Sequence, residues 1–323
     1  MMRKTRKIFI SILTFTMTIM LLTTVTFAWI SMSAISNIDG LGITASEGNE
    51  LEISIDGENY SNQLPSVLIQ DLIGEIKLYD VTTLDGINFQ TGGFRDVADA
   101  IPNEHYLTFD LWFRTVRNEK SLFLINNIKD LVTFNSNMPG TYVISRGVLW
   151  VTPVSFLNGP NAQDFVEKGT LGVYYGSETI RISVIEKNDD TNPLDTRTDS
   201  DLRRFIYDPS ENMDRGYGKI YGAYNYFFQT AQYWMDLPHQ IQQASYRLSA
   251  FDPNNPYQAL DNESMVGTMI ETEDMNIDGK TYYRTKVTIN IWIEGWDADT
   301  FDAVDKDDVK IQLQFKSAFP AEE

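Results

Sequence analysis

Hydrophobic and polar residues alternate along several short segments of this chain. The alternation is clearest in Leu107–Arg114, Val287–Ile293 and Val309–Phe315, where every second residue is Leu, Ile, Val or Phe. A period of two places such residues on one face of a β-strand. Further strand candidates, rich in aliphatic and aromatic residues, are Leu51–Ile55, Ile76–Val81, Leu122–Ile125, Gly147–Phe156, Ile180–Ile185 and Met265–Ile270.

Signals for helices are few. Ser66 could cap a short helix that ends before Gly74, and Tyr217–Trp234 is an aromatic stretch of mixed periodicity. Residues 186–263 contain polar, Pro-containing and Asn-containing stretches and are predicted to be a long loop or insertion. Asp56-Gly57, Asp85-Gly86 and Asp278-Gly279 are turn signals. The pattern predicts one all-β domain, an antiparallel β-sandwich over residues 29–323, with at most short helices.

The N-terminus has the composition of a secretory signal. Four basic residues within the first seven precede Ile8–Ile38, a stretch without charge. Thr26 and Ala28 are the small residues that signal peptidase requires, so residues 1–28 are predicted to be cleaved before Trp29. The alternative is an uncleaved membrane anchor, because about 20 apolar residues span a bilayer. Both interpretations place the rest of the chain outside the cytoplasm, secreted or at the cell surface.

Charge and composition exclude several functions. The 323-residue chain has a net charge of −19, and without residues 1–28 it has 22 basic and 45 acidic residues, a net charge of −23. Such a surface repels nucleic acids. The chain has no cysteine, which excludes thiol catalysis, and its two histidines, His105 and His239, lie in no catalytic motif. We therefore expect a protein that is not an enzyme and needs no cofactor, with calcium as the one candidate ion.

An acidic connection, Glu294–Asp308, follows the strand predicted at Val287–Ile293. Asp297, Asp299 and Asp302 within it are candidate ligands for calcium, which prefers clustered oxygen atoms. The spacing is not that of an EF-hand. The alternative is that the carboxylates form a solvated, charged loop.

Trp112 and Trp292 are out of phase with the core residues of their strands. If they are exposed on the outer face of the sheet, they could stack on a polysaccharide or on another subunit. The alternative is that residues 186–263, including Tyr217–Trp234, cover this face.

Residues 29–48 form a segment of low charge that signal cleavage would leave at the N-terminus. Such a segment can join the edge of a neighbouring copy as a donor strand. Trp29, Ile30, Ile38, Leu41 and Ile43 are the candidate contact residues. Loss of 29–48 should then abolish assembly and leave the sandwich folded. The alternative is that the segment pairs within its own sandwich, or that its first residues are disordered.

The sequence Thr26-Phe27-Ala28-Trp29, with the Gly-containing segment Asn37–Ala45 and a strand after it, resembles the start of the secreted TasA/camelysin-type proteins of Gram-positive bacteria and their wall-less relatives. Leu107–Arg114 and Val287–Trp296 look like segments of a wider set of secreted β proteins with the same start. The resemblance implies a jelly-roll-like sandwich and extracellular fibres built by donor-strand exchange. Camelysin-type proteins are classed as metalloproteases, but this chain has no recognisable set of zinc ligands.

The expected function is that of an exported, non-enzymatic surface or matrix protein, which associates with itself or with related surface proteins. The alternative is a module that binds a glycan or another ligand through Trp112 or Trp292. A calcium-dependent hydrolase is a third class. The membrane is expected to be contacted only through the signal segment.

Overall fold

The computed structural model describes residues 35–46, 51–74, 77–91, 97–126, 128, 131–136 and 138–322. Strands dominate this part of the chain, and its two α-helices are α2 (Ser66–Ile73) and α3 (Ala223–Ala231). The all-β class with short helices is therefore confirmed, and α2 lies where Ser66 and Gly74 predict a helix. Neither of these helices has the length and apolar character needed to cross a membrane. The predicted signal peptide lies outside the described residues.

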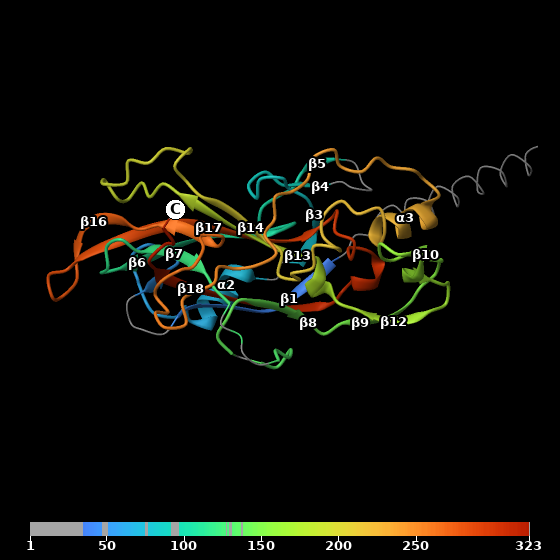
Figure 1. Cartoon of the computed structure of the whole chain (residues 1–323), viewed down its shortest axis with the longest axis horizontal. Helices are drawn as coiled ribbons and strands as arrows, with labels where there is room; N and C mark the ends of the chain where they lie inside the picture. Colours follow the sequence, from blue (N-terminus) through green and yellow to red (C-terminus); the bar gives the residue numbers. More distant parts are fainter. Residues whose placement is uncertain are drawn as a thin grey trace, which may run out of the picture.

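Most strands belong to one large mixed sheet (Figure 1). Its twelve strands among the described residues are β1 (Ile35–Ala45), β2 (Glu52–Ser54), β3 (Lys77–Val81), β6 (Leu107–Thr115), β7 (Ser121–Leu124), β8 (Tyr142–Ser145), β13 (Ile180–Lys187), β14 (Arg204–Tyr207), β15 (Met265–Thr268), β16 (Ile270–Met275), β17 (Thr281–Glu294) and β18 (Asp308–Ala318).

Three short pairs of strands lie beside this sheet. They are β4 (Gln90–Thr91) with β5 (Ala98–Asp99), β9 (Val148–Val151) with β12 (Leu171–Tyr174), and β10 (Phe156–Leu157) with β11 (Phe165–Val166). Three short 3₁₀ segments complete the fold: η1 (Ala162–Asp164), η2 (Gly176–Thr179) and η3 (Asp302–Val304).

The sheet has two halves that meet at β3. In one half β17 pairs with β13 and β16 along one edge, and with β6 along the other. In the other half β18 pairs with β1 along one edge and with β7 and β8 along the other. β3 pairs with both β1 and β17. The β1–β18 and β3–β17 pairings are parallel, so the sheet is mixed rather than purely antiparallel.

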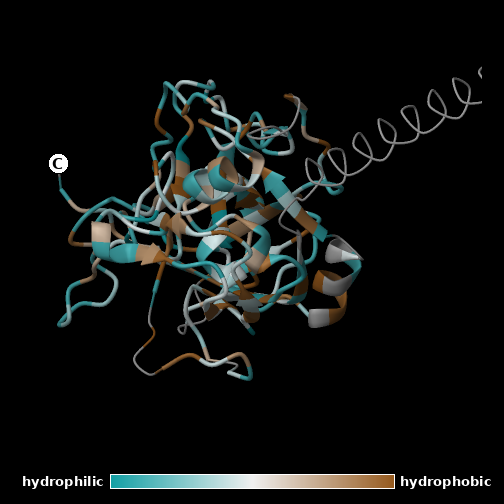
Figure 2. Ribbon diagram, turned by 90° about the vertical axis from the view of Figure 1, so that its right-hand side faces the viewer, coloured by the Kyte–Doolittle hydropathy of each residue, from teal (hydrophilic) through white to brown (hydrophobic). Residues whose placement is uncertain are grey.

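The apolar faces of the two halves pack against each other as a β-sandwich. The alternating residues of β6, β17 and β18 that define the sequence pattern are buried in one core cluster. Phe113 from one half and Phe315 from the other have ring centroids 4.7 Å apart. Figure 2 shows apolar segments within the body of the molecule, and loops of mixed polarity projecting from it. The hydrophobic effect therefore holds the two halves together.

The opposite face of β17 is also covered near its C-terminal end. Trp292 is fully buried, with its ring centroid 5.0 Å from that of Phe89. Val81, Tyr106 and Ile206 complete this second cluster. The expectation that Trp292 is exposed to ligands was wrong. Ile206 belongs to residues 186–263, so the alternative, a cover supplied partly by this region, is what the structure shows.

Residues 186–263 contain regular structure as well as loops. β14 extends the sheet beyond β13, pairing Arg204–Tyr207 with Ile182–Ile185. The aromatic stretch forms α3, whose first turn follows Gly222. Gly222 has φ +63°, and a Cβ atom there would lie 2.1 Å from the carbonyl oxygen of Ala298. A glycine is therefore required where this helix meets the acidic connection.

Candidate functional site

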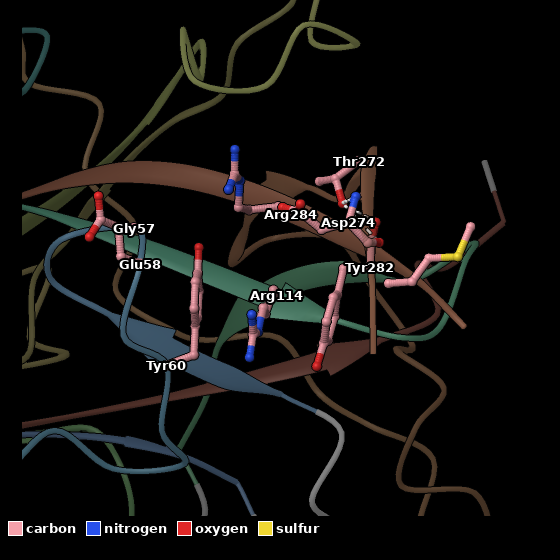
Figure 3. Close-up of a pocket in the computed structure, with 9 residues that line it drawn as sticks. Gly57, Glu58, Tyr60, Arg114, Thr272, Asp274, Tyr282 and Arg284 are labelled. Atoms are coloured by element: carbon pink, nitrogen blue, oxygen red, sulfur yellow. Dashed lines mark hydrogen bonds between the residues drawn. The ribbon is translucent and has the colours of Figure 1, made fainter. Parts of the chain in front are cut away.

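A cleft opens on the outer face of the half that contains β17 (Figure 3). It lies between β6, β17, β16 and the loop after β2, and its volume is about 400 Å³. Ligand pockets commonly have volumes of about 300–1,000 Å³. The lining residues are Gly57, Glu58, Tyr60, Arg114, Thr272, Asp274, Met275, Tyr282 and Arg284.

Arg114 lies between two tyrosine rings at the floor of this cleft. Its guanidinium carbon is 4.0 Å from the ring centroid of Tyr60 and 4.1 Å from that of Tyr282. Each contact is a cation–π interaction. Arg114 Nε lies 2.6 Å from Glu52 Oε2, which fixes the plane of the guanidinium. Its two terminal nitrogens make no hydrogen bond to the described residues, so they remain donors for a ligand.

The position of Tyr60 depends on the turn that the Asp56-Gly57 signal predicts. Asp56 Oδ1 accepts hydrogen bonds from the backbone amides of Glu58 and Asn59 at 2.9 and 2.8 Å. The Asn59 side-chain amide donates to Asp56 Oδ2 at 2.8 Å. The hydrogen bond from the Asn59 side chain, together with those from Ser54 and the two amides, holds the pKa of Asp56 well below its usual value. This network presents Tyr60 to the cleft in one orientation.

Burial raises the pKa of Tyr60 to about 12, although the positive charges of Arg284 and Arg114 oppose the rise. Its hydroxyl is buried and points toward Arg284 (Figure 3), which acts on it as a hydrogen-bond partner.

Arg284 forms the upper wall and is held by the 186–263 region. Its Nε lies 2.6 Å from Asp189 Oδ2, and its Nη2 donates to Thr191 Oγ1 at 2.9 Å. Trp112 lies behind this wall. Its Nε1 donates to Asp189 Oδ1 at 3.5 Å, and a Cβ atom added to Gly57 would meet its ring at 3.3 Å. Trp112 therefore supports the cleft and is not itself among the lining residues.

Comparisons of the chain with protein-family models, with curated proteins and with solved structures found no match. The candidate site is thus defined by its own chemistry. It offers flat aromatic and guanidinium surfaces, hydrogen-bond donors on Arg114 and Arg284, and acceptors on the exposed carboxylates of Glu58 and Asp274.

The three predicted calcium ligands do not come together. Asp297 is buried against Arg181, Asp299 Oδ1 lies 2.6 Å from Arg215 Nη2, and Asp302 Oδ2 accepts a hydrogen bond from the Tyr226 hydroxyl at 2.5 Å. No group of three or more potential metal ligands occurs among the described residues. The calcium hypothesis was therefore wrong for these residues, because each carboxylate is directed at its own partner.

Arg181 is the centre of a fully buried ionic cluster. Its Nη2 lies 2.7 Å from Asp208 Oδ2 and also contacts Asp297. Burial raises the pKa of both aspartates, and the charge of Arg181 opposes this rise. Glu294, also buried, accepts hydrogen bonds from Trp292 Nε1 at 3.0 Å and Gln242 Nε2 at 2.8 Å. Ion pairs and hydrogen bonds of Asp297 and Glu294 therefore hold the acidic connection against the rest of the protein, and these two carboxylates are not solvated.

Glu178 in η2 should make the stability of the protein depend on pH. Burial, with the charges of Asp299 and Asp208, raises its pKa from 4.5 to about 7. The folded state therefore holds a proton that the unfolded state releases above about pH 4.5, so the stability contributed by this proton is lost as pH rises through 7. We expect Glu178→Gln to raise the free energy of unfolding at pH 8 by on the order of 2 kcal/mol and to change it little at pH 5.

Urea unfolding of both proteins at pH 5 and pH 8 measures this difference. Glu167→Gln, at an exposed carboxylate of the same region, is the control and should have the same small effect at both pH values. An equal effect of Glu178→Gln at pH 5 and pH 8 would contradict the assignment.

The predicted assembly residues are only partly described. Trp29 and Ile30 lie outside the described residues. Ile38, Leu41 and Ile43 belong to β1, and Leu41 and Ile43 are buried in the core while Ile38 packs against it. β1 pairs with β18 and β3 of the same chain. The alternative, pairing within its own sandwich, is what the structure shows for Ile35–Ala45.

The sequence analysis missed Tyr60, Arg114, Tyr282 and Arg284. A signal was present, since Arg114 is out of phase with the core in the same way as Trp112, and Tyr282 and Arg284 share the phase of Trp292. The histidines are placed apart from the cleft. His105 Nδ1 accepts a hydrogen bond from the amide of Ile101 at 2.9 Å, and its ring packs edge-on against Tyr79.

Proposed function

We propose that this is an exported surface protein that binds a neutral saccharide in the cleft around Arg114. The observation that carries the proposal is the stack of Tyr60, Arg114 and Tyr282, in which the guanidinium lies between the two rings with its terminal nitrogens available. The proposal that the protein is exported rests on the signal-like sequence of residues 1–28.

The choice of ligand class follows from the pairing of donors and acceptors. A sugar hydroxyl both donates and accepts, so it suits a cleft where arginine nitrogens lie near carboxylates. The apolar face of a sugar ring suits the tyrosines. Glu58 and Asp274 form no salt bridge within the described residues. Together with the net charge of −19 they disfavour an acidic polymer.

Isothermal titration of the protein with cellohexaose, mannohexaose, chitohexaose and polygalacturonate tests the proposal. We expect at least one neutral hexasaccharide to bind and polygalacturonate to bind more weakly or not at all. Tyr282→Ala removes one ring from the stack, and we expect it to weaken binding by a factor of about 10 or more, which corresponds to about 1.4 kcal/mol.

Tyr233→Ala is the matched control, because Tyr233 is 69% exposed and lies outside the cleft. It should leave the affinity unchanged. The proposal fails if no member of the panel binds with a dissociation constant below about 1 mM, an affinity near −4 kcal/mol. It also fails if Tyr282→Ala binds as tightly as the original protein.

Self-association through β1 is a second candidate function. β1 is the first described strand, and its register with β18 extends from Asn37 to Ala45. If one copy gives this strand to another, the same parallel register can form between chains, as in domain swapping. The resemblance of Thr26–Ala45 to the start of TasA/camelysin-type proteins supports this candidate.

A further inference from the structure

A ribbon of two strands presents an uncovered apolar face at the end of the molecule opposite the cleft. β9 and β12 pair with Leu149 opposite Val173 and Val151 opposite Leu171. These four aliphatic side chains are between 50% and 66% exposed. The intervening residues of the ribbon, Trp150 and Tyr174, face the other way and pack on the aromatic cluster around Phe301. Contiguous exposed apolar surfaces of this kind mark interaction sites.

The start of β1 lies against the base of this ribbon. Asp307 connects the two, because its carboxylate accepts hydrogen bonds from the amides of Gly147 and Gly176 at 3.0 and 2.8 Å, while its carbonyl oxygen accepts one from the amide of Asn37 at 3.0 Å. A Cβ atom at Gly176 would lie 3.0 Å from Ser36 Oγ. The ribbon therefore has a fixed position beside the point where residues 1–34 join the described fold.

The sequence before β1 is the uncharged stretch that is able to span a bilayer. Six residues separate Ala28 from Ile35, and a fully extended chain covers at most about 25 Å over the seven Cα-to-Cα steps between them. A ribbon strand of four residues is about 14 Å long. If residues 8–28 remain in a membrane, the ribbon thus lies within reach of its surface.

Two exposed aromatic residues lie at the same end of the molecule as the ribbon, but not on its outer face. α3 packs on the inner face of the ribbon through Tyr226, whose ring centroid is 5.6 Å from that of Trp150. Tyr233 and Trp234, which follow the helix, are 69% and 66% exposed. Tyrosine and tryptophan favour the interface between lipid and water. α3 and β12 both lie at one end of the molecule, and β16 lies at the other (Figure 1).

We propose that, in the uncleaved chain, the outer face of the β9–β12 ribbon docks on the lipid bilayer that holds the N-terminal apolar segment. Leu149, Val151, Leu171 and Val173 enter the interfacial region. The cleft around Arg114 then lies at the end of the molecule far from the membrane. The docking does not depend on what the cleft binds.

The absence of cysteine makes a direct test possible, because each introduced cysteine can be labelled alone. The full chain is reconstituted in phosphatidylcholine vesicles with an environment-sensitive nitrobenzoxadiazole label at Val151→Cys. The matched control is Ile277→Cys, at a fully exposed residue of the distant β16–β17 turn. Lipids that carry a doxyl quencher at the top of the acyl chain report contact with the bilayer.

We expect blue-shifted emission at position 151, quenched at least twofold by the doxyl lipid, and no quenching at position 277. Adding Leu149→Asp and Val173→Asp should abolish the quenching at 151, while co-flotation with the vesicles shows that the chain stays anchored and circular dichroism shows that it stays folded. An unquenched, water-like label at position 151 would overturn the proposal. A blue-shifted label that doxyl lipids do not quench would also overturn it, since it would assign this face to a second copy of the chain.

Discussion

A chain that begins at Asn49, and so lacks β1, is expected not to fold. This reverses the expectation that the sandwich survives the loss of residues 29–48. Leu41 and Ile43 are 8% and 1% exposed within the core, and burying each contributes about 1.5–3 kcal/mol. The backbone pairing with β18 and β3 adds about 1 kcal/mol for each hydrogen bond. The total is comparable to the whole stability of a typical domain, about 5–15 kcal/mol.

Circular dichroism and urea unfolding of chains that begin at Trp29 and at Asn49 measure this effect. The first chain retains β1 and is the control. We expect a cooperative transition for the first and none for the second. A synthetic peptide of residues 29–48 should restore the strand signal of the shorter chain, whereas the same peptide with Leu41→Asp and Ile43→Asp should not.

This add-back experiment also bears on strand exchange. If the peptide restores the fold, β1 can be supplied by another molecule, and negative-stain electron microscopy of the chain from Trp29 should show filaments or closed oligomers. Monodisperse single copies would contradict self-association through β1. Equal urea midpoints for the chains from Trp29 and Asn49 would contradict the structural role given to β1.

Arg181→Leu is expected to have the second large effect, a loss of about 3–5 kcal/mol in the free energy of unfolding. The side chain is fully buried, and its removal leaves Asp208 and Asp297 facing each other without a cation. Buried carboxylates without a partner must bind protons before the chain can fold. The variant should therefore recover part of its stability as the pH falls from 8 to 5.

Arg146→Leu is the matched control for this variant. Arg146 also contacts two aspartates, Asp39 and Asp308 at 3.3 and 3.2 Å, but its side chain is 54% exposed. Exposed ion pairs contribute about 0–1 kcal/mol, so this variant should unfold at nearly the same urea concentration as the original protein. A similar loss of stability in both variants would contradict the importance given to burial of the Arg181 cluster.

Local alternation was sufficient to predict the strands that have one face on the core. β6, β17 and β18 include the segments Leu107–Arg114, Val287–Ile293 and Val309–Phe315, in which all odd-numbered residues are buried and most even-numbered residues are only partly buried. The Asp278-Gly279 signal lies at the turn of the β16–β17 hairpin, but the strand predicted before it, Met265–Ile270, corresponds to β15 and pairs with β7 instead.

Other elements have no local signal of this kind. β14 is buried on both faces from Phe205 to Tyr207, so its residues do not alternate. The predicted strand Gly147–Phe156 is divided into β9 and β10 around Pro153, which has no amide hydrogen to donate to a sheet. α3 begins after a glycine with positive φ, and its aromatic residues face two different clusters. Tertiary contacts, rather than local sequence, determine the structure of β14, of Gly147–Phe156 and of α3.

The residues of the cleft could not be predicted from local sequence patterns either. The alternation shows only that Arg114 is out of phase with the core, yet its role depends on Tyr60 and Tyr282, which lie more than 50 residues before it and more than 160 after it. The register of β2, β6 and β17 brings these residues together, with Arg114 opposite Glu52 on one side and Arg284 on the other. Periodicity gives the face of a strand, but it does not give the register.

The pairing of β1 with β18 has a consequence for the time at which this protein can fold. The first and last strands of the described chain lie side by side, with Ala45 opposite Phe315. Contacts over such a sequence separation form slowly, because a long loop must close first. If the chain is exported N-terminus first, as proposed, β1 would leave the cytoplasm long before β18. The β1–β18 pairing would then form only after the last strand has crossed.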